Sequence, residues 1–298
     1  MSSIFVIGSS NTDMVIRSQK LPAPGETILG GEFLMTAGGK GANQAVAAAK
    51  LGGNVIFACK VGDDIFGTQA VQNFREVGIN TDFICTDKVQ PSGVALILVD
   101  AKGENSIAVA PGANGNLLPI DLEKVIEQTK PGDIVLIQLE IPISTVAYAL
   151  KHCHQQGAKV ILNPAPACML DDGLFQYVHT ITPNETEAEL LTGIKVIDQQ
   201  SAADAAAILI GKGVKTVIIT LGAKGAYYHD GLLNKLIPSP AVSAVDSTAA
   251  GDVFNGALAV AVTENMDIEQ ALAFACKAAA VSVTRMGAQA SAPLRSEL

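Results

Sequence analysis

A short run of small residues that ends in an aspartate is the segment of this sequence best suited to chemistry. It reads Asp246-Ser-Thr-Ala-Ala-Gly-Asp252 and leads into the apolar run VFNGALAVAV, which is typical of a buried helix. A helix that begins at Ala249, Ala250 and Gly251 leaves free backbone N–H groups that can hold a phosphate. Asp252 then lies in the first helical turn, where the helix dipole favours its ionised form. Phosphoryl transfer needs an acceptor for the hydroxyl proton, and Asp252 can be that acceptor or, more simply, a helix cap.

A glycine-rich segment, Gly38-Gly39-Lys40-Gly41-Ala42-Asn43, is a second candidate binding element. Glycine allows a ligand to approach the backbone closely, and Lys40 and Asn43 offer polar contacts near a helix start. An ordinary transition from loop to helix is the alternative interpretation. The segment is not a Walker A phosphate loop, because Leu34 occupies the first glycine position and Gly41 follows the lysine. The sequence also lacks GxGxxG, which argues against a dinucleotide-dependent oxidoreductase.

Polar residues at the ends of apolar runs form a third group. Asn11 and Asp13 follow the strand-like run IFVIG, and Glu140 follows DIVLIQL. Carboxylates and an amide that face one crevice suit a polyhydroxylated ligand, because each makes several hydrogen bonds in fixed directions. Taken alone, each of these residues is equally well explained as a turn former or a helix cap.

Two further segments fit a nucleotide site. In the run TPNETE, Asn184 and Glu187 lie one helical turn apart, so both can face the same site. A carboxylate at Glu187 can hold Mg²⁺ through water, because magnesium keeps much of its hydration shell. The same pattern also fits a helix start with a capping acid. The run TLGAKG, residues 220–225, ends a strand in a glycine turn against which a nucleotide can lie.

Apolar strand-like runs alternate with helical segments over most of the chain. The expected strands lie at 4–8, 54–62, 133–139, 159–163 and 216–222, and the expected helices at 39–52, 65–76, 119–128, 143–156, 184–192, 201–212, 250–263 and 268–284. This order predicts an α/β fold with a doubly wound, mostly parallel sheet flanked by helices and with ligands at the carboxyl ends of the strands. The stretches 11–37 and 92–110 break the alternation and predict a small projecting β-sheet within a single domain, 1–298.

Composition narrows the classes of function. The chain has 298 residues, of which 49% are hydrophobic and 16% charged, and its net charge is −9. An acidic chain without basic clusters is a poor partner for nucleic acid or for an anionic membrane. No apolar run reaches the ~20 residues that span a bilayer, and the N-terminus carries no export signal. The five scattered cysteines form no CxxC pair, so we expect free thiols in the cytoplasm.

These motifs together resemble the ribokinase family of carbohydrate kinases. The resemblance runs through GSSNTD, PAPGET, GGKGANQAV, LNPAPA, ITPNETEAELLTG, VDSTAAGDVFNGAL and VTRMGAQ, and it covers nearly the whole chain. It implies a Rossmann-like sheet with a β-lid that often forms a homodimer contact. It also implies phosphoryl transfer from ATP to the 5-hydroxyl of D-ribose, giving D-ribose 5-phosphate and ADP. A related kinase for fructose, deoxyribose or a nucleoside is the nearest alternative, and a non-catalytic sugar or nucleotide sensor is a more distant one.

The resemblance also assigns roles to individual residues. Asp252 matches the catalytic base. The anion hole matches Ala249, Ala250 and Gly251. The positions that hold ribose match Asn11, Asp13, Gly39, Lys40, Gly41, Asn43 and Glu140. The nucleotide contacts match Asn184, Thr220, Gly222, Lys224, Gly225, Gly251 and Cys276.

Metal ions complete the set of expectations. Glu187 matches the acid that is tied to Mg²⁺ and phosphate. An activating monovalent cation, usually K⁺, matches Asp246, Thr248, Ser282, Arg285, Gly287 and Ser291. Several of these residues would contribute backbone carbonyls, so their side chains matter less. The main departure from the family pattern is Cys276, which stands where relatives often place His or Asn near the adenine.

Overall fold

Short, continuously apolar strands form the centre of this structure, a computed structural model that describes residues 2–298. Nine strands make one large sheet. From edge to edge they are β13 (Asn234–Ile237), β12 (Ala226–His229), β11 (Thr216–Thr220), β10 (Thr180–Ile181), β9 (Lys159–Leu162), β8 (Ile134–Ile137), β1 (Ile4–Ile7), β4 (Val55–Gly62) and β5 (Ile84–Asp87). Neighbours from β11 to β5 are parallel, whereas the pairs β11–β12 and β12–β13 are antiparallel. Every residue of β1 and β8 is buried, as expected of strands covered on both faces.

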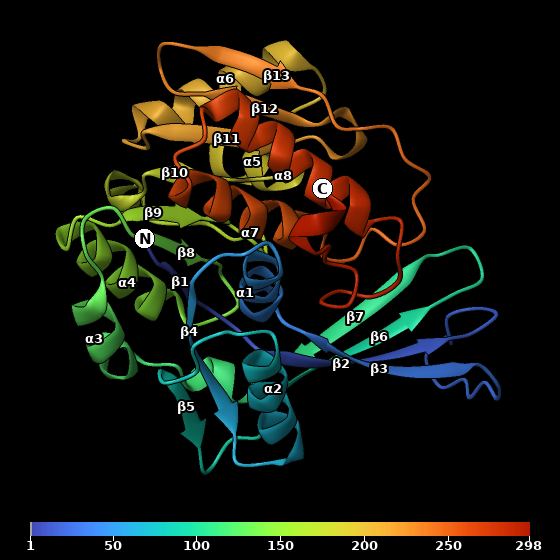
Figure 1. Ribbon diagram of the computed structural model, residues 1–298. Helices are drawn as coiled ribbons and strands as arrows, with labels where there is room; N and C mark the ends of the chain where they lie inside the picture. Colours follow the sequence, from blue (N-terminus) through green and yellow to red (C-terminus); the bar gives the residue numbers. More distant parts are fainter. Residues whose placement is uncertain (1) are drawn as a thin grey trace.

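Two layers of helices cover the two faces of the large sheet (Figure 1). The first layer consists of α1 (Lys40–Lys50), α2 (Ile65–Glu76), α7 (Ala250–Thr263) and α8 (Ile268–Ser282). The second consists of α3 (Pro119–Gln128), α4 (Ile143–Gln155), α5 (Glu185–Thr192) and α6 (Gln199–Gly211). Alternate residues of β1 pack on opposite layers, with Val6 in one apolar cluster and Ile7 in the other. The prediction of a doubly wound α/β fold is confirmed.

The large sheet reverses its strand order beside β1. The chain passes from β1 to β4 and β5 on one side, and then returns to place β8 on the other side of β1. Open α/β sheets bind ligands in the crevice outside the carboxyl ends of the strands at such a switch point. The residues that follow β1, β8 and β9 therefore lie where a ligand site is expected.

A second, four-stranded sheet projects from the body of the molecule (Figure 1). Its strand order is β3 (Glu32–Gly38), β2 (Asn11–Arg17), β6 (Gly93–Val99) and β7 (Asn105–Ala110). The central pair β2–β6 is parallel, and both outer pairs are antiparallel. Both sequence segments that were expected to form a small sheet supply its strands. Because β2 follows β1 after a short turn, this sheet begins at the carboxyl edge of the large sheet.

Most predicted elements begin and end within a few residues of the observed ones. The expected strands do not include β5, β10, β12 and β13, which have two to four residues each and do not stand out as continuous apolar runs. Helix α6 begins at Gln199 rather than at residue 201, because the Asp198 side chain caps it by accepting a hydrogen bond from the Ser201 N–H.

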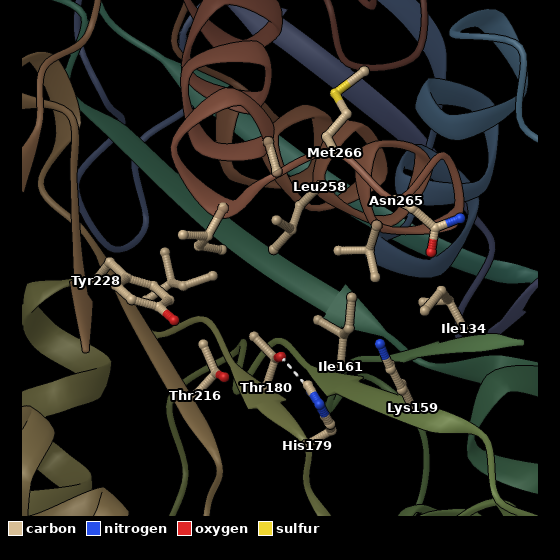
Figure 2. A pocket seen from close by; sticks show the side chains of 14 residues that line it. Ile134, Lys159, Ile161, His179, Thr180, Thr216, Tyr228, Leu258, Asn265 and Met266 are labelled. Carbon is tan, nitrogen blue, oxygen red and sulfur yellow. Dashed lines mark hydrogen bonds between the residues drawn. The ribbon is translucent and has the colours of Figure 1, made fainter. Parts of the chain in front are cut away.

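A cavity of about 320 Å³ lies at the opposite, amino-terminal edge of the large sheet (Figure 2). Its lining includes Lys159 and Thr216 at the starts of β9 and β11, and Leu258 and Met266 from α7 and the turn after it. His179 also lines it, with Nδ1 2.9 Å from the Thr180 hydroxyl. The cavity is therefore separate from the crevice at the switch point, where the predicted site residues lie.

Neither a membrane span nor a metal cluster occurs in the described part of the chain. Within residues 2–298, no helix combines the length and the apolar character needed to cross a bilayer. Over the same residues, no group of three or more His, Cys, Asp or Glu side chains is arranged to hold a metal ion. All five cysteines have free thiols.

The close contact between α1 and α7 gives a first testable prediction. A Cβ on Gly256 would lie 2.8 Å from the Ala47 Cβ and 2.8 Å from the Gln44 carbonyl oxygen. We expect Gly256→Ala to force the helices apart and to lower the free energy of unfolding by about 1–3 kcal/mol, measured by chemical denaturation.

Gly211→Ala at the end of α6 is the matched control, because a Cβ there meets no atom within 4 Å. Its stability should equal or exceed that of the parent protein, since alanine restricts the unfolded chain. Equal stability of the two variants would contradict the close helix contact.

Candidate active site

The start of α7 has the geometry predicted for an anion site. Ala249 is the N-cap, with a left-handed backbone at φ 60°, and no side chain caps the helix. Gly251 is exposed, and a Cβ built there meets no atom within 4 Å. The N–H groups of Gly251 and Asp252 have no acceptor among residues 2–298. Free amides at a helix start, with open space in front of them, are the groups that bind a phosphate.

Asp252 lies in the same helical turn with its carboxylate buried. The residue is 5% exposed. Its Oδ2 accepts a hydrogen bond from Asn43 Nδ2 at 2.9 Å, and its Oδ1 accepts one from Gln44 Nε2 at 2.9 Å. Burial raises the pKa of Asp252, although Lys40 and the two amide donors oppose this. Burial thus opposes the helix dipole that was expected to favour the ionised form, and the raised pKa makes Asp252 a better proton acceptor.

The glycine-rich segment starts α1 and packs its first turn against the end of β1. Gly39 has a φ of 88°, and a Cβ there would lie 2.7 Å from the Asn11 nitrogen. A Cβ on Gly41 would lie 2.6 Å from the Ser9 nitrogen. These glycines are therefore required for the packing of α1, in addition to the ligand approach that the sequence predicts.

Glu140, after β8, holds the start of α1 in place. Its Oε2 accepts hydrogen bonds from the Lys40 N–H at 2.9 Å and from the Ser9 hydroxyl at 2.5 Å. The Ser9 hydroxyl in turn accepts one from the Gly41 N–H at 3.3 Å. A carboxylate at a helix start is favoured by the free amides and by the helix dipole. The sequence analysis did not name Ser9 as a site residue. Its position directly after the first strand was the one feature that could have indicated this role.

Asn11 is held by a residue that sequence reasoning also missed. Asn114 Nδ2 donates to Asn11 Oδ1 at 2.8 Å, and Asn114 Oδ1 accepts from the Ser10 N–H at 2.9 Å. Asn114 is buried in a short 3-10 turn that connects the small sheet to α3. Its local sequence resembles any polar turn, so no signal distinguishes it.

Four carboxylates surround one ammonium group in this crevice. Burial, followed by the charges of Glu140 and Asp252, raises the pKa of Asp13 to about 6. Burial alone would lower the pKa of Lys40, but Asp252, Glu140, Glu187 and Asp13 raise it above its ordinary value. Lys40 therefore stays protonated and is the only cation among these groups. The crevice therefore has more acidic than basic groups. Partial burial makes the ionised form of these carboxyl groups less stable than it would be in water.

Asn184 and Glu187 form a capping box at the start of α5. The Asn184 side chain accepts from the Glu187 N–H at 2.8 Å, and the Glu187 carboxylate accepts from the Asn184 N–H at 2.9 Å. Capping therefore accounts for both residues without a ligand. Glu187 is nevertheless buried, burial raises its pKa, and the charges of Lys40 and Asp252 also act on it. A parallel bridge places Thr220 beside Asn184, so these three residues lie at the same edge as the crevice.

The turn after β11 contains the remaining predicted nucleotide contacts. Gly222 and Gly225 have positive φ values of 55° and 107°, and Lys224 between them is exposed. A Cβ on Gly225 would lie 2.0 Å from the Ile237 carbonyl oxygen, so this turn requires glycine. Cys276 differs, because it is 3% exposed within the apolar layer of α7 and α8, and burial raises its pKa to about 11. The structure gives its thiol a packing role, and its contact with a nucleotide stays a prediction.

Asp246 joins the segment before α7 to the segment after α8. Its two carboxylate oxygens accept hydrogen bonds from the N–H groups of Thr248 and Gly287, both at 2.9 Å. Burial would raise the pKa of Asp246, but these bonds lower it below its ordinary value. Arg285 turns its guanidinium toward Glu297, so only its backbone can face the Asp246 segment.

The other predicted cation residues are satisfied locally. The hydroxyls of Ser282 and Ser291 donate to the carbonyls of Ala279 and Ala288, each at 2.8 Å. The structure thus brings Asp246, Thr248 and Gly287 together, which is three of the six positions that were assigned to a monovalent cation.

The fold and the site define a class of protein. A doubly wound sheet carries a buried carboxylate next to an open helix start, and polar side chains gather at the switch point of the sheet, where open α/β sheets have their ligand crevice. Free helix amides can bind phosphate, a buried carboxylate can accept a proton, and the polar groups suit a polyhydroxylated acceptor. These are the parts of a phosphotransferase that acts on a sugar hydroxyl.

Comparison with known proteins gives the family. The sequence matches the family described as pfkB family carbohydrate kinase over residues 1–295, and the chain belongs to this family. A ribokinase from Haemophilus influenzae is 44% identical over 295 residues, which are 99% of this chain and 96% of that protein. A deoxyribokinase from Salmonella typhi is 40% identical over 291 residues, 97% of this chain and 95% of that protein. A solved structure of Arabidopsis thaliana ribokinase complexed with ribose and ATP has a TM-score of 0.91 at 34% identity, covering 99% of this chain and 97% of that one.

The raised pKa of Asp13 predicts a stability change that depends on pH. An acid whose pKa rises from 3.8 to about 6 on folding stabilises the folded state only when protonated, so this contribution is lost as the pH rises through 6. Asp13→Asn keeps the side chain neutral and should raise the unfolding free energy at pH 8 by up to about 3 kcal/mol.

The gain should be clearly smaller at pH 5, where the folded parent already carries much of the proton. Thermal unfolding of both proteins at the two pH values, without sugar or ATP, measures the difference. The same gain at both pH values would show that Asp13 is not destabilised by ionisation.

Proposed function

We propose that this chain catalyses the ATP-dependent phosphorylation of D-ribose at its 5-hydroxyl, giving D-ribose 5-phosphate and ADP. The observation that carries the proposal is the buried Asp252 carboxylate, which lies between the glycine-rich start of α1 and the open start of α7. Family membership and the ribokinase relatives support the same reaction. The structurally similar ribokinase from Arabidopsis thaliana was solved in complex with ribose and ATP, which are the two substrates proposed here.

Ribose is held in the crevice by side chains from three different segments. Asn11 and Asp13 come from β2, Lys40 and Asn43 from α1, and Glu140 from the end of β8. The Asn43 Oδ1 atom is buried and has no donor among residues 2–298, so a sugar hydroxyl can satisfy it. The backbones of Gly39 and Gly41 complete this part of the site, and the 5-hydroxyl faces Asp252.

Asp252 accepts the proton as the oxygen of the sugar attacks the γ-phosphorus of ATP. The new P–O bond forms as the bond to the β–γ bridging oxygen breaks, and ADP leaves with that electron pair. The backbone amides of Ala249, Ala250 and Gly251 at the start of α7 stabilise the charge of the transferred group. One of these three, Ala250, also donates to the Ser247 carbonyl at 3.2 Å, so Gly251 is the best placed.

The nucleotide lies along the turn after β11 in this proposal. Asn184 and Thr220 are adjacent there, and the Gly222–Gly225 turn brings backbone close to the ligand. Lys224 is exposed beside this turn and can reach a phosphate. Cys276 is the weakest member of this set, since its thiol faces the apolar layer.

Two metal ions complete the proposal. The carboxylates of the crevice outnumber Lys40, so a bound polyphosphate needs added positive charge, and Mg²⁺ supplies it. Glu187 can hold Mg²⁺ through water, which fits an ion that retains most of its hydration. A monovalent cation, K⁺ in this proposal, fits the loops that Asp246 joins, because the lowered pKa keeps this carboxylate charged. We also place the enzyme in the cytoplasm, since five free thiols fit a reducing compartment.

Deoxyribose is the second candidate substrate, because a deoxyribokinase is 40% identical to this chain. An ADP-release assay with ribose, 2-deoxyribose, fructose and a nucleoside distinguishes the candidates, run with K⁺ and then with Na⁺. We expect the highest kcat/KM with ribose and a higher rate with K⁺. No ADP above background with any of these acceptors would refute the kinase function.

Asp252→Ala tests the role of the proposed base. We expect kcat to fall by about 10²–10⁴-fold, because general-base catalysis typically contributes this much. Ribose affinity, measured by calorimetry, should change little, whereas Asp13→Asn should weaken it. Turnover at the parent rate would remove Asp252 from the mechanism.

The small sheet acts as a lid over the sugar and as a dimer contact in this proposal. Register places Phe33 opposite Ile16, and Met35 and Leu96 opposite Met14, so these side chains share one face. Phe33, Met35 and Leu96 are 60%, 48% and 55% exposed in the single chain. An apolar face of this kind commonly marks a contact with a second protein surface, and an identical lid can cover it.

Phe33→Asp places a charge on this face, at the most exposed of the three apolar side chains, and should convert the dimer to monomers. Sedimentation velocity measures the state of assembly. Leu232→Asp is the matched control, because Leu232 is 92% exposed in the β12–β13 turn, away from the lid. A Phe33→Asp protein with the parent's sedimentation coefficient would exclude this face as the dimer contact.

A further inference from the structure

A chain of buried amide side chains lies behind Asp252 and has no role in the reaction described so far. Gln44 on α1, Gln138 after β8 and Asn163 after β9 belong to three separate elements. Gln44 and Gln138 are 0% exposed, and Asn163 is 7% exposed. Amides buried to this degree are costly unless they are hydrogen-bonded. Three such groups beside the proposed base therefore call for a physical reason.

Gln44 is the centre of this chain. Its Nε2 donates to Asp252 Oδ1 at 2.9 Å and to Asn163 Oδ1 at 3.0 Å. Its Oε1 accepts from Gln138 Nε2 at 2.5 Å. Every polar atom of the Gln44 side chain is thus paired, and each partner comes from a different part of the fold.

The hydrogen bonds permit only one orientation of the Gln44 amide. A rotation by 180° would set its oxygen against the oxygens of Asp252 and Asn163, and its nitrogen against the nitrogen of Gln138. Asn163 is fixed in turn, because its Nδ2 donates to the Thr182 carbonyl at 3.2 Å. The donor that faces Asp252 is therefore fixed by the ends of β8, β9 and β10.

Asn43 and Gln44 donate to different oxygens of the Asp252 carboxylate. Asn43 donates to Oδ2 and lies at the crevice, where it can also meet the sugar. Gln44 donates to Oδ1 from the interior and has no exposed surface. Among the hydrogen-bond partners of the Gln44 side chain, Asp252 is the one with a role in the proposed reaction.

We propose that Gln44 is a positioning residue that holds the Asp252 carboxylate in one rotation about its side chain, with Gln138 and Asn163 holding Gln44. The remaining lone pairs of the carboxylate are thereby directed at the 5-hydroxyl of the sugar before ATP binds. Reactions of this type depend on such placement of the reacting groups. The hydrogen bond from Gln44 also stabilises the charged form and lowers the pKa of Asp252 against the effect of burial. The proposal rests on the assignment of Asp252 as the base.

Gln44→Met tests it, because methionine has nearly the same length and shape but no donor. We expect kcat to fall about 10- to 100-fold, because misplacement of a reacting group by about 1 Å can lower a rate by this much. KM for ribose should change less than about threefold, since Gln44 does not touch the sugar. The acid limb of the kcat–pH profile should move to higher pH, because the charged carboxylate loses a donor.

Thr145→Val is the matched control for loss of a buried hydrogen bond. Thr145 is 0% exposed on α4, and its hydroxyl donates to the Leu117 carbonyl at 2.7 Å, away from the crevice. This variant should lower the melting temperature but leave kcat and the pH profile at parent values. If Gln44→Met also lowers only the melting temperature, Gln44 is structural and the proposal is overturned.

Gln138→Met is the second variant, in case Gln44→Met does not fold. It leaves Gln44 in place but removes the donor that fixes its amide, so kcat and the acid limb should shift in the same direction by a smaller factor. Parent values of both would overturn the proposal.

A double-mutant comparison separates this inference from the proposed role of Asp252. In an Asp252→Ala background, Gln44→Met should cause no further loss of kcat, because its target is gone. If Asp252→Ala keeps parent turnover, the base assignment fails together with this proposal. If Asp252→Ala loses turnover but Gln44→Met does not, the base assignment stands and only this proposal fails.

Discussion

The burial of one negative charge, on Asp252, is the constraint around which the rest of the site is built. An ionised carboxylate removed from water without partners costs far more than a protein's net stability. The fold compensates it with the Lys40 ammonium group and with the side-chain amides of Asn43 and Gln44. All three partners are on the first turns of α1. The position of α1 relative to α7 therefore decides both whether the protein tolerates this charge and where the charge points.

A packing contact between the same two helices provides that position. Gly256 on α7 lies against the backbone of α1, and a single added methyl group would meet three α1 atoms within 2.9 Å. Gly39 and Gly41 play the same part at the other end of α1, where they let it lie against the end of β1. The glycines of this protein thus serve the chemistry through close packing, in addition to any direct approach of a ligand to the backbone.

The crevice contains interactions that lower the stability of the folded protein when no ligand is bound and that a ligand can use. Asp13, Glu140 and Glu187 lie near Asp252, and burial and mutual repulsion raise the pKa of Asp13 to about 6. The left-handed backbone of Ala249, uncommon for a residue with a side chain, sets the free amides of α7 toward open space. Strain and unpaired charge of this kind concentrate at functional sites, where bound substrate satisfies the groups that the free protein leaves unsatisfied.

The sequence alone determined the elements with a clear period and the residues inside recognisable motifs. The long helices and buried parallel strands follow from apolar patterning, and Asp252, the glycine-rich segment and the capping pair Asn184 and Glu187 follow from local chemistry. The tertiary structure decided what depends on contacts between distant segments. Gln44 and Asn114 carry no local signal, because their roles arise from partners more than 90 residues away. The raised pKa of Asp252 could likewise not be predicted from the sequence. The effect of the helix dipole follows from the position of Asp252 in its helix, whereas its burial depends on the whole fold.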